Sequence, residues 1–321
     1  MAPRPQVIAL EEHYLDAEVK PHMAGPDGAA GAGRVAALLD DVGQGRIADM
    51  DAAGIDIQVL SHGAPSIQKI ADAALAVRLA QGANDRLAET VRAHPDRFAA
   101  FAMLPTADPN AAADELERAV TRLGFKGAMV HGLAGGRFLD DRRFWPIFER
   151  AQALDVPLYM HPAVPHPAVI DTYYREYAEK FPNLLRAAWG FTVETATQGI
   201  RLVLSGIFDH YPRLKIILGH LGEGLPFYLW RINMALTRDG AGPSWFRDAF
   251  CEHFWVTTSG FFSDPALLCC MLELGADRIL FSVDYPFVEN APGTAWMERA
   301  QLSAEDKAKI LSGNAKRLLK M

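Results

Sequence analysis

The sequence predicts an α/β protein folded as a (β/α)8 TIM barrel. Short runs of β-branched or apolar residues alternate along the chain with longer segments of helical periodicity. Eight such runs occur, and a helical segment follows each of them. Because parallel strands need a crossover between them, eight strand–helix units are expected to close on themselves. A doubly wound open sheet is the alternative fold.

The individual elements follow from local patterns. The expected strands are Val7–Leu10, Ile57–Leu60, Phe98–Met103, Gly127–Val130, Pro157–Met160, Lys215–Leu218, Phe254–Thr257 and Arg278–Phe281. The expected helices are Gly45–Ala53, Ile70–Ala93, Pro109–Leu123, Phe144–Leu154, Leu184–Asp209, Gly224–Leu236, Pro265–Leu274 and Ala304–Leu319. Asp108 followed by Pro109 is typical of a helix start, and His94-Pro95 should end the helix before it.

Two segments interrupt the alternation, near residues 22–36 and 162–182. The first is rich in Gly and Ala, and the second is rich in Pro and then Tyr. Both follow the C-terminal end of a strand, the side on which barrel active sites are built, so they are candidate lids or ordinary solvated loops. With these insertions, residues 1–321 are expected to form a single domain. Gly31, Gly33 and Ala36 fit a dinucleotide-binding spacing only weakly, because no strand leads into them.

Composition excludes several classes of protein. Half of the residues are hydrophobic and 22% are charged, so a sizeable core can form and disorder is excluded. A balance of 32 Lys and Arg against 39 Asp and Glu gives a net charge of −7, which predicts neither nucleic-acid nor membrane binding. The N-terminus lacks a signal-peptide pattern, and three cysteines make no disulfide framework. We therefore expect a cytoplasmic protein.

Residues that follow the predicted strands indicate a metal site. Glu11 and His13 follow the first strand at a spacing that places both side chains on one face. His161 follows the fifth strand and Asp284 the eighth. In a barrel these strand ends meet at one mouth. Imidazole nitrogens and carboxylate oxygens suit zinc, manganese or iron(II), and a set without cysteine argues against a closed structural zinc site.

A second group of polar residues follows the sixth strand. His220 lies at the strand end and Glu223 lies three residues later, at the expected first turn of the next helix. The carboxylate can hold the imidazole as an acid–base pair, or it can merely stabilise the helix N-terminus. Arg231, further along that helix, could bind an anionic substrate or form a surface ion pair. His62 and His131 also lie just past strand ends and could line the pocket.

With these residues in place, the chain resembles the metal-dependent aromatic-acid decarboxylases of the amidohydrolase superfamily. The branch is the one typified by aminocarboxymuconate semialdehyde decarboxylase, and the γ-resorcylate decarboxylases resemble the chain most. The matching stretches are Ala9–His13, Ala83–Glu89, Pro95–Pro105, Pro157–Pro162, Ser205–Ile232, Thr257–Gly260, Ala276–Phe287 and Asn314–Leu319. They cover nearly the whole chain from Val7 onward.

The resemblance implies a barrel of the metal-dependent hydrolase type and a role for each site residue. Glu11, His13, His161 and Asp284 match ligands of one divalent ion, zinc or manganese, with no organic cofactor. The implied reaction is nonoxidative decarboxylation of a small aromatic carboxylate, an ortho-hydroxybenzoate such as 2,6-dihydroxybenzoate, with Asp284 as the proton donor to the ring. The implied assembly is a homodimer or homotetramer. Further matches are His220 and Glu223 beside the metal and a substrate-positioning Arg231.

Some positions depart from the resorcylate enzymes. His62 and His131 stand where those enzymes carry Asn, and Tyr285 stands where Trp is usual. These three positions are expected to contact the substrate and shape the pocket, so the substrate itself is left open. The alternative function is a metal-dependent hydrolase, such as a lactonase, that acts through a metal-activated water with His220 or Asp284 as base.

Overall fold

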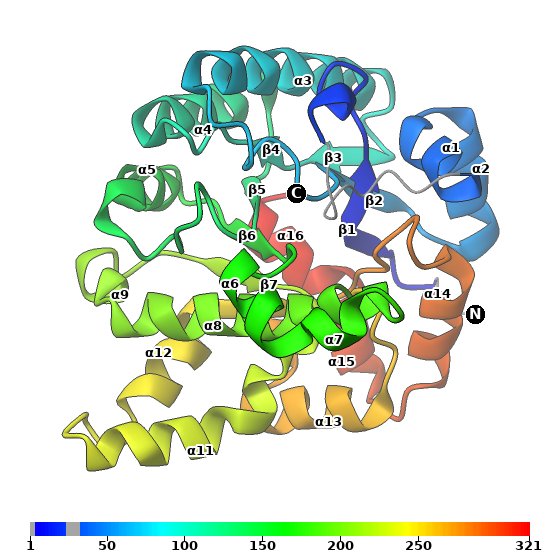
Figure 1. The fold of residues 1–321 in the computed structure, drawn as a ribbon. Coiled ribbons are helices and arrows are strands. Elements are labelled where there is room, and N and C mark those ends of the chain that lie inside the picture. Colours follow the sequence, from blue (N-terminus) through cyan, green and yellow to red (C-terminus); the bar gives the residue numbers. More distant parts are fainter. Residues whose placement is uncertain (1–3, 24–32) are drawn as a thin grey trace.

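The computed structural model describes residues 4–23 and 33–321, and its strands form one parallel series. The strand order is β1-β2-β3 in one sheet and β4-β5-β6-β7-β8-β9 in the next. The strands are β1 (Ile8–Tyr14), β2 (Ile57–His62), β3 (Phe98–Ala100), β4 (Ala102–Met103), β5 (Ala128–His131), β6 (Leu158–His161), β7 (Ile216–Leu218), β8 (Phe254–Thr257) and β9 (Ile279–Leu280). Figure 1 shows them around a common centre with helices outside.

Eight strand positions were predicted, and all eight contain strands. β3 and β4 are two parts of the predicted third strand, separated by Phe101, whose N–H donates to the Leu60 carbonyl (2.9 Å). A backbone hydrogen bond from His13 to the Tyr285 carbonyl (2.7 Å) joins β1 to the segment after β9. The chain therefore has the predicted (β/α)8 architecture.

The helices form the outer layer. The α-helices are α1 (Arg34–Asp40), α2 (Gln44–Ala53), α3 (Ala73–Ala93), α4 (Pro109–Leu123), α5 (Trp145–Leu154), α6 (Pro167–Val169), α7 (Arg175–Ala178), α8 (Gly190–Leu204), α9 (Ile207–His210), α10 (His220–Glu223), α11 (Leu225–Arg238), α12 (Trp245–His253), α13 (Asp264–Glu273), α14 (Asn290–Arg299), α15 (Ala304–Ala308) and α16 (Asn314–Leu319). Short 3-10 or π turns are η1 (Lys20–His22), η2 (Arg142–Phe144), η3 (Ile170–Tyr174), η4 (Pro182–Leu185), η5 (Ala276–Arg278) and η6 (Lys309–Gly313).

The structure corrects several predicted helices. The helix expected over Leu184–Asp209 begins only at Gly190 and is interrupted at Gly206, where a φ of 75° ends α8 and starts α9. The sequence prediction missed α1, α12 and α14, because α1 follows a Gly-rich segment and α14 contains both Pro and Gly near its start.

The centre of the barrel is a small apolar core that α16 closes at one end. Its strand residues are Ile8, Leu10, Val59, Ala99, Phe101, Met129, Tyr159, Ile217 and Leu280. Ala315, Leu318 and Leu319 of the C-terminal helix pack against them. In Figure 1, α16 lies behind the strands near the centre of the ring. The site must therefore lie at the other end, where the strands have their carboxyl ends.

A β-bulge in β1 decides which residues of that strand face inward. Ala9 pairs with Gln58 and Glu12 pairs with Leu60, so β1 has one residue more than β2 over the same length. An extra residue reverses the alternation of side chains between the two faces. Because of it, Glu11 faces the barrel interior.

The two predicted loop insertions differ in how much of each the structure describes. Most of the segment near 22–36 lies outside the described residues. The segment near 162–182 forms short helical turns, α6, η3 and α7, which Figure 1 shows in front of the barrel mouth. Among the residues that the structure describes, no helix combines the length and the apolar character that crossing a membrane requires.

A buried ion pair ties the segment after β1 to α3. Asp16 accepts two hydrogen bonds from Arg86, each of 2.8 Å, and its Oδ1 also accepts the backbone N–H groups of Glu18 and Val19. The Asp16 side chain is only 5% exposed. Burial alone would raise the pKa of Asp16, but the hydrogen bonds from Arg86 lower it below its ordinary value.

We expect Asp16→Asn to lower the free energy of unfolding by about 1–3 kcal/mol at neutral pH, because it leaves Arg86 without its buried partner. Since the folded-state pKa of Asp16 is depressed, this stability is present above the unfolded-state pKa and is lost as pH falls through the folded-state value. Denaturant unfolding at several pH values measures both the loss of stability and its dependence on pH. Glu18→Gln is the control, because Glu18 contacts the same arginine (3.1 Å) but is 64% exposed. Equal effects of the two variants would contradict this account.

Candidate metal centre

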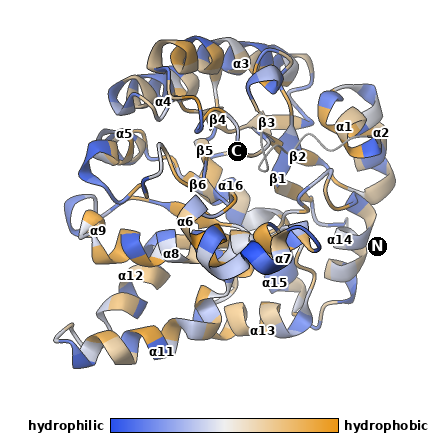
Figure 2. Cartoon of the chain, viewed as in Figure 1, coloured by the Kyte–Doolittle hydropathy of each residue, from blue (hydrophilic) through white to orange (hydrophobic). Residues whose placement is uncertain are grey.

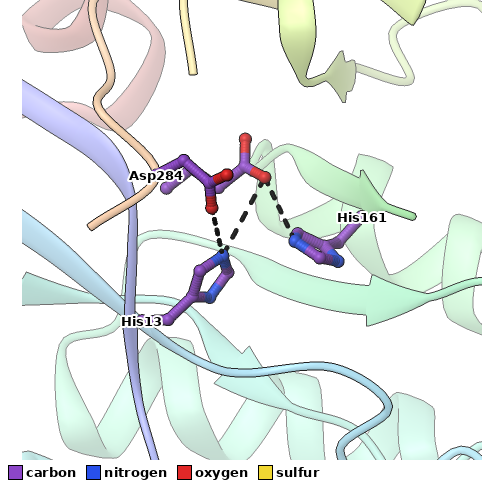
Figure 3. A group of neighbouring side chains, drawn as sticks. His13, His161 and Asp284 are labelled. Atoms are coloured by element: carbon purple, nitrogen blue, oxygen red, sulfur yellow. Dashed lines mark ion pairs between the residues drawn. The ribbon is translucent and has the colours of Figure 1, made fainter. Parts of the chain in front are cut away.

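The four residues predicted as metal ligands lie together at the barrel mouth. Their ligand atoms all fall within 4.8 Å of one another, and Figure 3 shows His13, His161 and Asp284 converging on one point. His161 Nε2 lies 3.1 Å from Glu11 Oε1, and His13 Nε2 lies 3.3 Å from Asp284 Oδ1. Only Asp284 is partly exposed, at 17% of its side chain. The group is therefore open on one side.

Hydrogen bonds orient both histidines for ligation. His161 Nδ1 donates to the Pro162 carbonyl (2.7 Å), and His13 Nδ1 lies 3.3 Å from Ser61 Oγ. The carbonyl fixes the His161 tautomer that leaves Nε2 free to bind a metal, and the Ser61 hydroxyl orients the His13 ring. Burial lowers the pKa of His13, which favours the neutral, ligating form.

The second carboxylate oxygen of Glu11 is held by the protein. Glu11 Oε2 accepts hydrogen bonds from Tyr159 and Ser259, whose hydroxyl oxygens lie 2.8 and 2.6 Å from Thr257 Oγ1. Gly219 is required beside them, because a Cβ there would lie 2.9 Å from Glu11 Oε2. The hydroxyl cluster leaves Glu11 Oε1 facing the histidines.

The donor set fits a divalent ion. Two imidazole nitrogens and two carboxylates suit zinc or manganese. Buried polar atoms normally have hydrogen-bond partners, yet Glu11 Oε1 and His13 Nε2 have none within the described residues. Both atoms face the same point, so a cation between them would complete their coordination.

His220 and Glu223 form the predicted pair but in an unexpected conformation. His220 Nδ1 lies 2.7 Å from Glu223 Oε1. Glu223 was predicted at the first turn of an ordinary helix; instead, residues 220–224 all have positive φ and form a left-handed turn. Gly222 fits this turn, because a Cβ there would lie 2.8 Å from Val256 Cγ1. A left-handed conformation is unfavourable for His and Glu, and such strain is typical of functional sites.

Neighbouring ionisable groups shift the pKa values of His220 and Glu11. Burial alone would lower the pKa of His220, but the carboxylates of Glu223 and Glu11 raise it well above its ordinary value. Burial alone would raise the pKa of Glu11, but its interactions with His220 and His161 lower it below its ordinary value. The His220 imidazole lies beside the ligand group, with its Nε2 4.0 Å from Glu11 Oε1 and 3.8 Å from Asp284 Oδ2.

Glu12 anchors the segment that carries Asp284. Its carboxylate accepts the backbone N–H groups of Val283 (2.9 Å) and Tyr285 (3.2 Å) and the hydroxyl of Ser282 (3.2 Å). These groups flank Asp284, whose φ of 72° lies in the left-handed region. Burial raises the pKa of Glu12 to about 8.

Sequence reasoning missed Glu12, Tyr159 and Ser259. Strand alternation could have found Tyr159, because it lies two residues before His161 on β6 and therefore faces the same interior. Glu12 could not be found in this way, since its function depends on a segment about 270 residues away.

His62 and His131, two further predicted site residues, lie close to the ligand group. His62 and His131 are buried at the ends of β2 and β5, and the ring centroid of His131 lies 4.8 Å from that of His161. Burial lowers the pKa of His62 to about 4 and that of His131 well below its ordinary value. Their assignment as substrate contacts stays a prediction.

Tyr285 and Arg231 lie less directly at the site. The Tyr285 ring packs under the Arg46 guanidinium, 4.8 Å from its Cζ, so its backbone rather than its side chain serves the ligand group. Arg231 is exposed on α11, which extends to the edge of the molecule in Figure 1. Substrate contact by either residue stays a prediction.

Known proteins are similar to this chain in sequence and in fold. The amidohydrolase family model matches residues 22–321. The gamma-resorcylate decarboxylase of Polaromonas sp. (strain JS666 / ATCC BAA-500) is 42% identical over 327 residues, which cover 98% of each chain. A solved structure of dihydroxybenzoic acid decarboxylase from Polaromonas sp. JS666, with bound manganese and the inhibitor 2-nitroresorcinol, matches with a TM-score of 0.91 and 42% identity, covering 99% of this chain and 97% of that one.

A second solved structure is also similar to this chain over its full length. It is a 2,6-dihydroxybenzoate decarboxylase complexed with 2,6-dihydroxybenzoate, and it matches with a TM-score of 0.90 and 40% identity. The match covers 99% of this chain and all of the other chain. The similarity thus spans nearly the whole chain.

We expect the purified protein to carry one divalent ion per chain. His161→Ala should lower metal affinity at least tenfold, because it removes a ligand, whereas His220→Ala should retain the ion, because His220 lies outside the ligand group. Elemental analysis after dialysis against a weak chelator measures both. Equal metal loss in the two variants would show that the ligand set is assigned wrongly.

Proposed function

The chain belongs to the amidohydrolase family, and we propose that it catalyses the metal-dependent, nonoxidative decarboxylation of a hydroxylated aromatic acid such as 2,6-dihydroxybenzoate. The observation that carries this proposal is the open ligand group in which Asp284 is partly exposed and has His220 Nε2 3.8 Å from its Oδ2. The gamma-resorcylate decarboxylase and the 2,6-dihydroxybenzoate decarboxylase that match over nearly their full length are named for such acids, which supports the substrate class.

The reaction needs a proton at the ring carbon that bears the carboxylate. When bound, the divalent ion would hold the carboxylate and the adjacent phenolate and stabilise their charge. Asp284, on the exposed side of the ligand group, donates a proton to that ring carbon. The carbon–carboxylate bond then breaks, its electron pair restores the aromatic ring, and CO2 leaves. One proton is consumed in each turnover.

His220 and Glu223 are placed to return that proton. His220 Nε2 lies 3.8 Å from Asp284 Oδ2, and Nδ1 is held by Glu223. An imidazole that is held by a carboxylate partner can relay a proton to Asp284 between turnovers. The left-handed turn keeps the two side chains together on the side facing Asp284.

We further propose that the protein works as a homo-oligomer, a dimer or tetramer. The α11–α13 face exposes five large apolar side chains, namely Phe227, Tyr228, Trp230, Leu268 and Leu272, each more than half exposed. Figure 2 shows hydrophobic residues along both helices at the edge of the molecule. Exposed apolar patches of this kind mark protein interfaces. Arg231 lies among these aromatic residues, so its surroundings depend on the assembly.

Two smaller proposals concern the chain as a whole. We propose that residues 1–321 form one barrel domain, since helices from both ends of the chain pack on one ring of strands. We also propose the cytoplasm as its location, because all three cysteines are free, which suits a reducing compartment.

The manganese-loaded protein should release CO2 from 2,6-dihydroxybenzoate. A panel that adds 2,3-dihydroxybenzoate, salicylate and a set of lactones separates decarboxylation from hydrolysis. Hydrolysis of a lactone without CO2 release from any acid would contradict the proposed reaction.

Asp284→Asn should lower the rate of CO2 release about 10²–10⁴-fold at equal metal loading, because the amide cannot donate the proton that a carboxylic acid supplies. Asp277→Asn, at the opposite end of β9, is the matched control and should keep the rate of the natural protein. Full activity in the Asp284 variant would mean that the proton donor lies elsewhere.

The assembly can be tested by light scattering after size exclusion. We expect a mass of two or four times 35.2 kDa for the natural chain, and a shift toward 35.2 kDa for Phe227→Glu, because a charge would be buried in the interface. Leu204→Glu introduces the same charge at a half-exposed residue on α8 and should leave the mass unchanged. A monomeric natural chain would refute the assembly.

A further inference from the structure

A cavity of about 590 Å³ opens beside the ligand group, between the segments that follow β2, β5 and β6. Its lining is mostly apolar, including Ile70, Leu133 and Ile170, and its volume lies within the range of about 300–1,000 Å³ that is usual for small-molecule sites. His131 joins the cavity to the ligand group, because it lines the cavity and its ring lies 4.8 Å from that of His161.

A chain of hydrogen bonds sets the tautomer of His131. Gln68 Nε2 donates to the Leu104 carbonyl (3.2 Å), which turns Gln68 Oε1 toward His131 Nδ1 (3.3 Å). An amide oxygen can only accept, so Nδ1 of His131 carries the proton. A neutral imidazole has one donor and one acceptor, which makes Nε2 of His131 an acceptor.

That acceptor has no hydrogen-bond partner in the part of the chain that the structure describes. His131 Nε2 is buried and makes no hydrogen bond within the described residues. His62 repeats the pattern, because its Nδ1 lies 3.0 Å from the Gly63 carbonyl and its buried Nε2 is also unpartnered. Both rings face neutral oxygens through Nδ1, so both offer an acceptor through Nε2.

We propose that His131 Nε2 is a specificity site that accepts a hydrogen bond from a ring hydroxyl of the bound acid, other than the hydroxyl beside the metal. The apolar cavity behind it takes the rest of that edge of the ring. This inference rests on the proposed function and names its substrate class, acids with a second hydrogen-bond donor on the ring. A methoxy group at that position has no hydrogen to donate, and its oxygen lone pair repels the lone pair of the imidazole nitrogen. Acids that carry a methoxy group there should therefore bind more weakly.

Two nonreactive probes isolate this contact. 2-Nitroresorcinol carries two hydroxyls beside a nitro group, and 3-methoxy-2-nitrophenol differs from it by one methyl group on one of them. Calorimetric titration of the manganese-loaded protein should give at least tenfold tighter binding of 2-nitroresorcinol. His131→Phe removes the acceptor, and His131→Asn replaces it with an amide that can also donate; in both variants the ratio should fall below about threefold.

His253→Asn is the matched control. His253 is also buried with its Nδ1 3.0 Å from a carbonyl, that of Leu214, but it lies just before β8, at the opposite end of the barrel. It should keep the natural ratio. Equal binding of the two probes by the natural protein, or an unchanged ratio in a folded, metal-loaded His131 variant, would overturn the inference.

The outcomes also separate this inference from the proposed reaction. A tenfold ratio that is lost in the His131 variants, without CO2 release from any acid, would refute the reaction and support the specificity site. CO2 release together with equal probe binding would support the reaction and refute the specificity site. Failure of both probes to bind would overturn the specificity site, while CO2 release would still decide the reaction.

Discussion

The extra residue in β1 is the constraint on which the site depends. Leu10 packs in the interior core, and its neighbour Glu11 also faces the interior, which a regular strand does not allow. Without the bulge, Glu11 and His13 would face the helical layer with Ala9, and the ligand group could not form. The bulge also turns Glu12 outward, where it holds the segment that carries the fourth ligand.

The rest of the site is built to support charges that the interior would otherwise disfavour. Hydroxyl groups of Tyr159 and Ser259 satisfy one oxygen of Glu11, while the other faces the histidines. The left-handed turn holds His220 against Glu223, so the imidazole lies between that carboxylate and the ligand carboxylates. Buried charges persist only when paired in this way. Asp284, the partly exposed ligand, is accessible to substrate and can donate a proton to it.

Much of this could be predicted from the sequence, because its signals are local. Short β-branched or apolar runs located all eight strands, and polar residues at strand ends located the ligand group. The missed features depend on distant contacts. The left-handed conformation of His220 and Glu223 could not be recognised, because neither residue type favours it, and Glu12 looks like any second acid beside Glu11. The break of the predicted helix at Gly206 follows from a backbone conformation that glycine permits but does not require.

The central claim is that three strand ends place four ligands around one ion because of the bulge. Anomalous diffraction from crystals of the zinc-loaded protein tests it directly. The account predicts one peak at about 2.0–2.2 Å from His13 Nε2, His161 Nε2 and one oxygen each of Glu11 and Asp284. A peak bound elsewhere, or one that lacks Glu11 among its ligands, would contradict it.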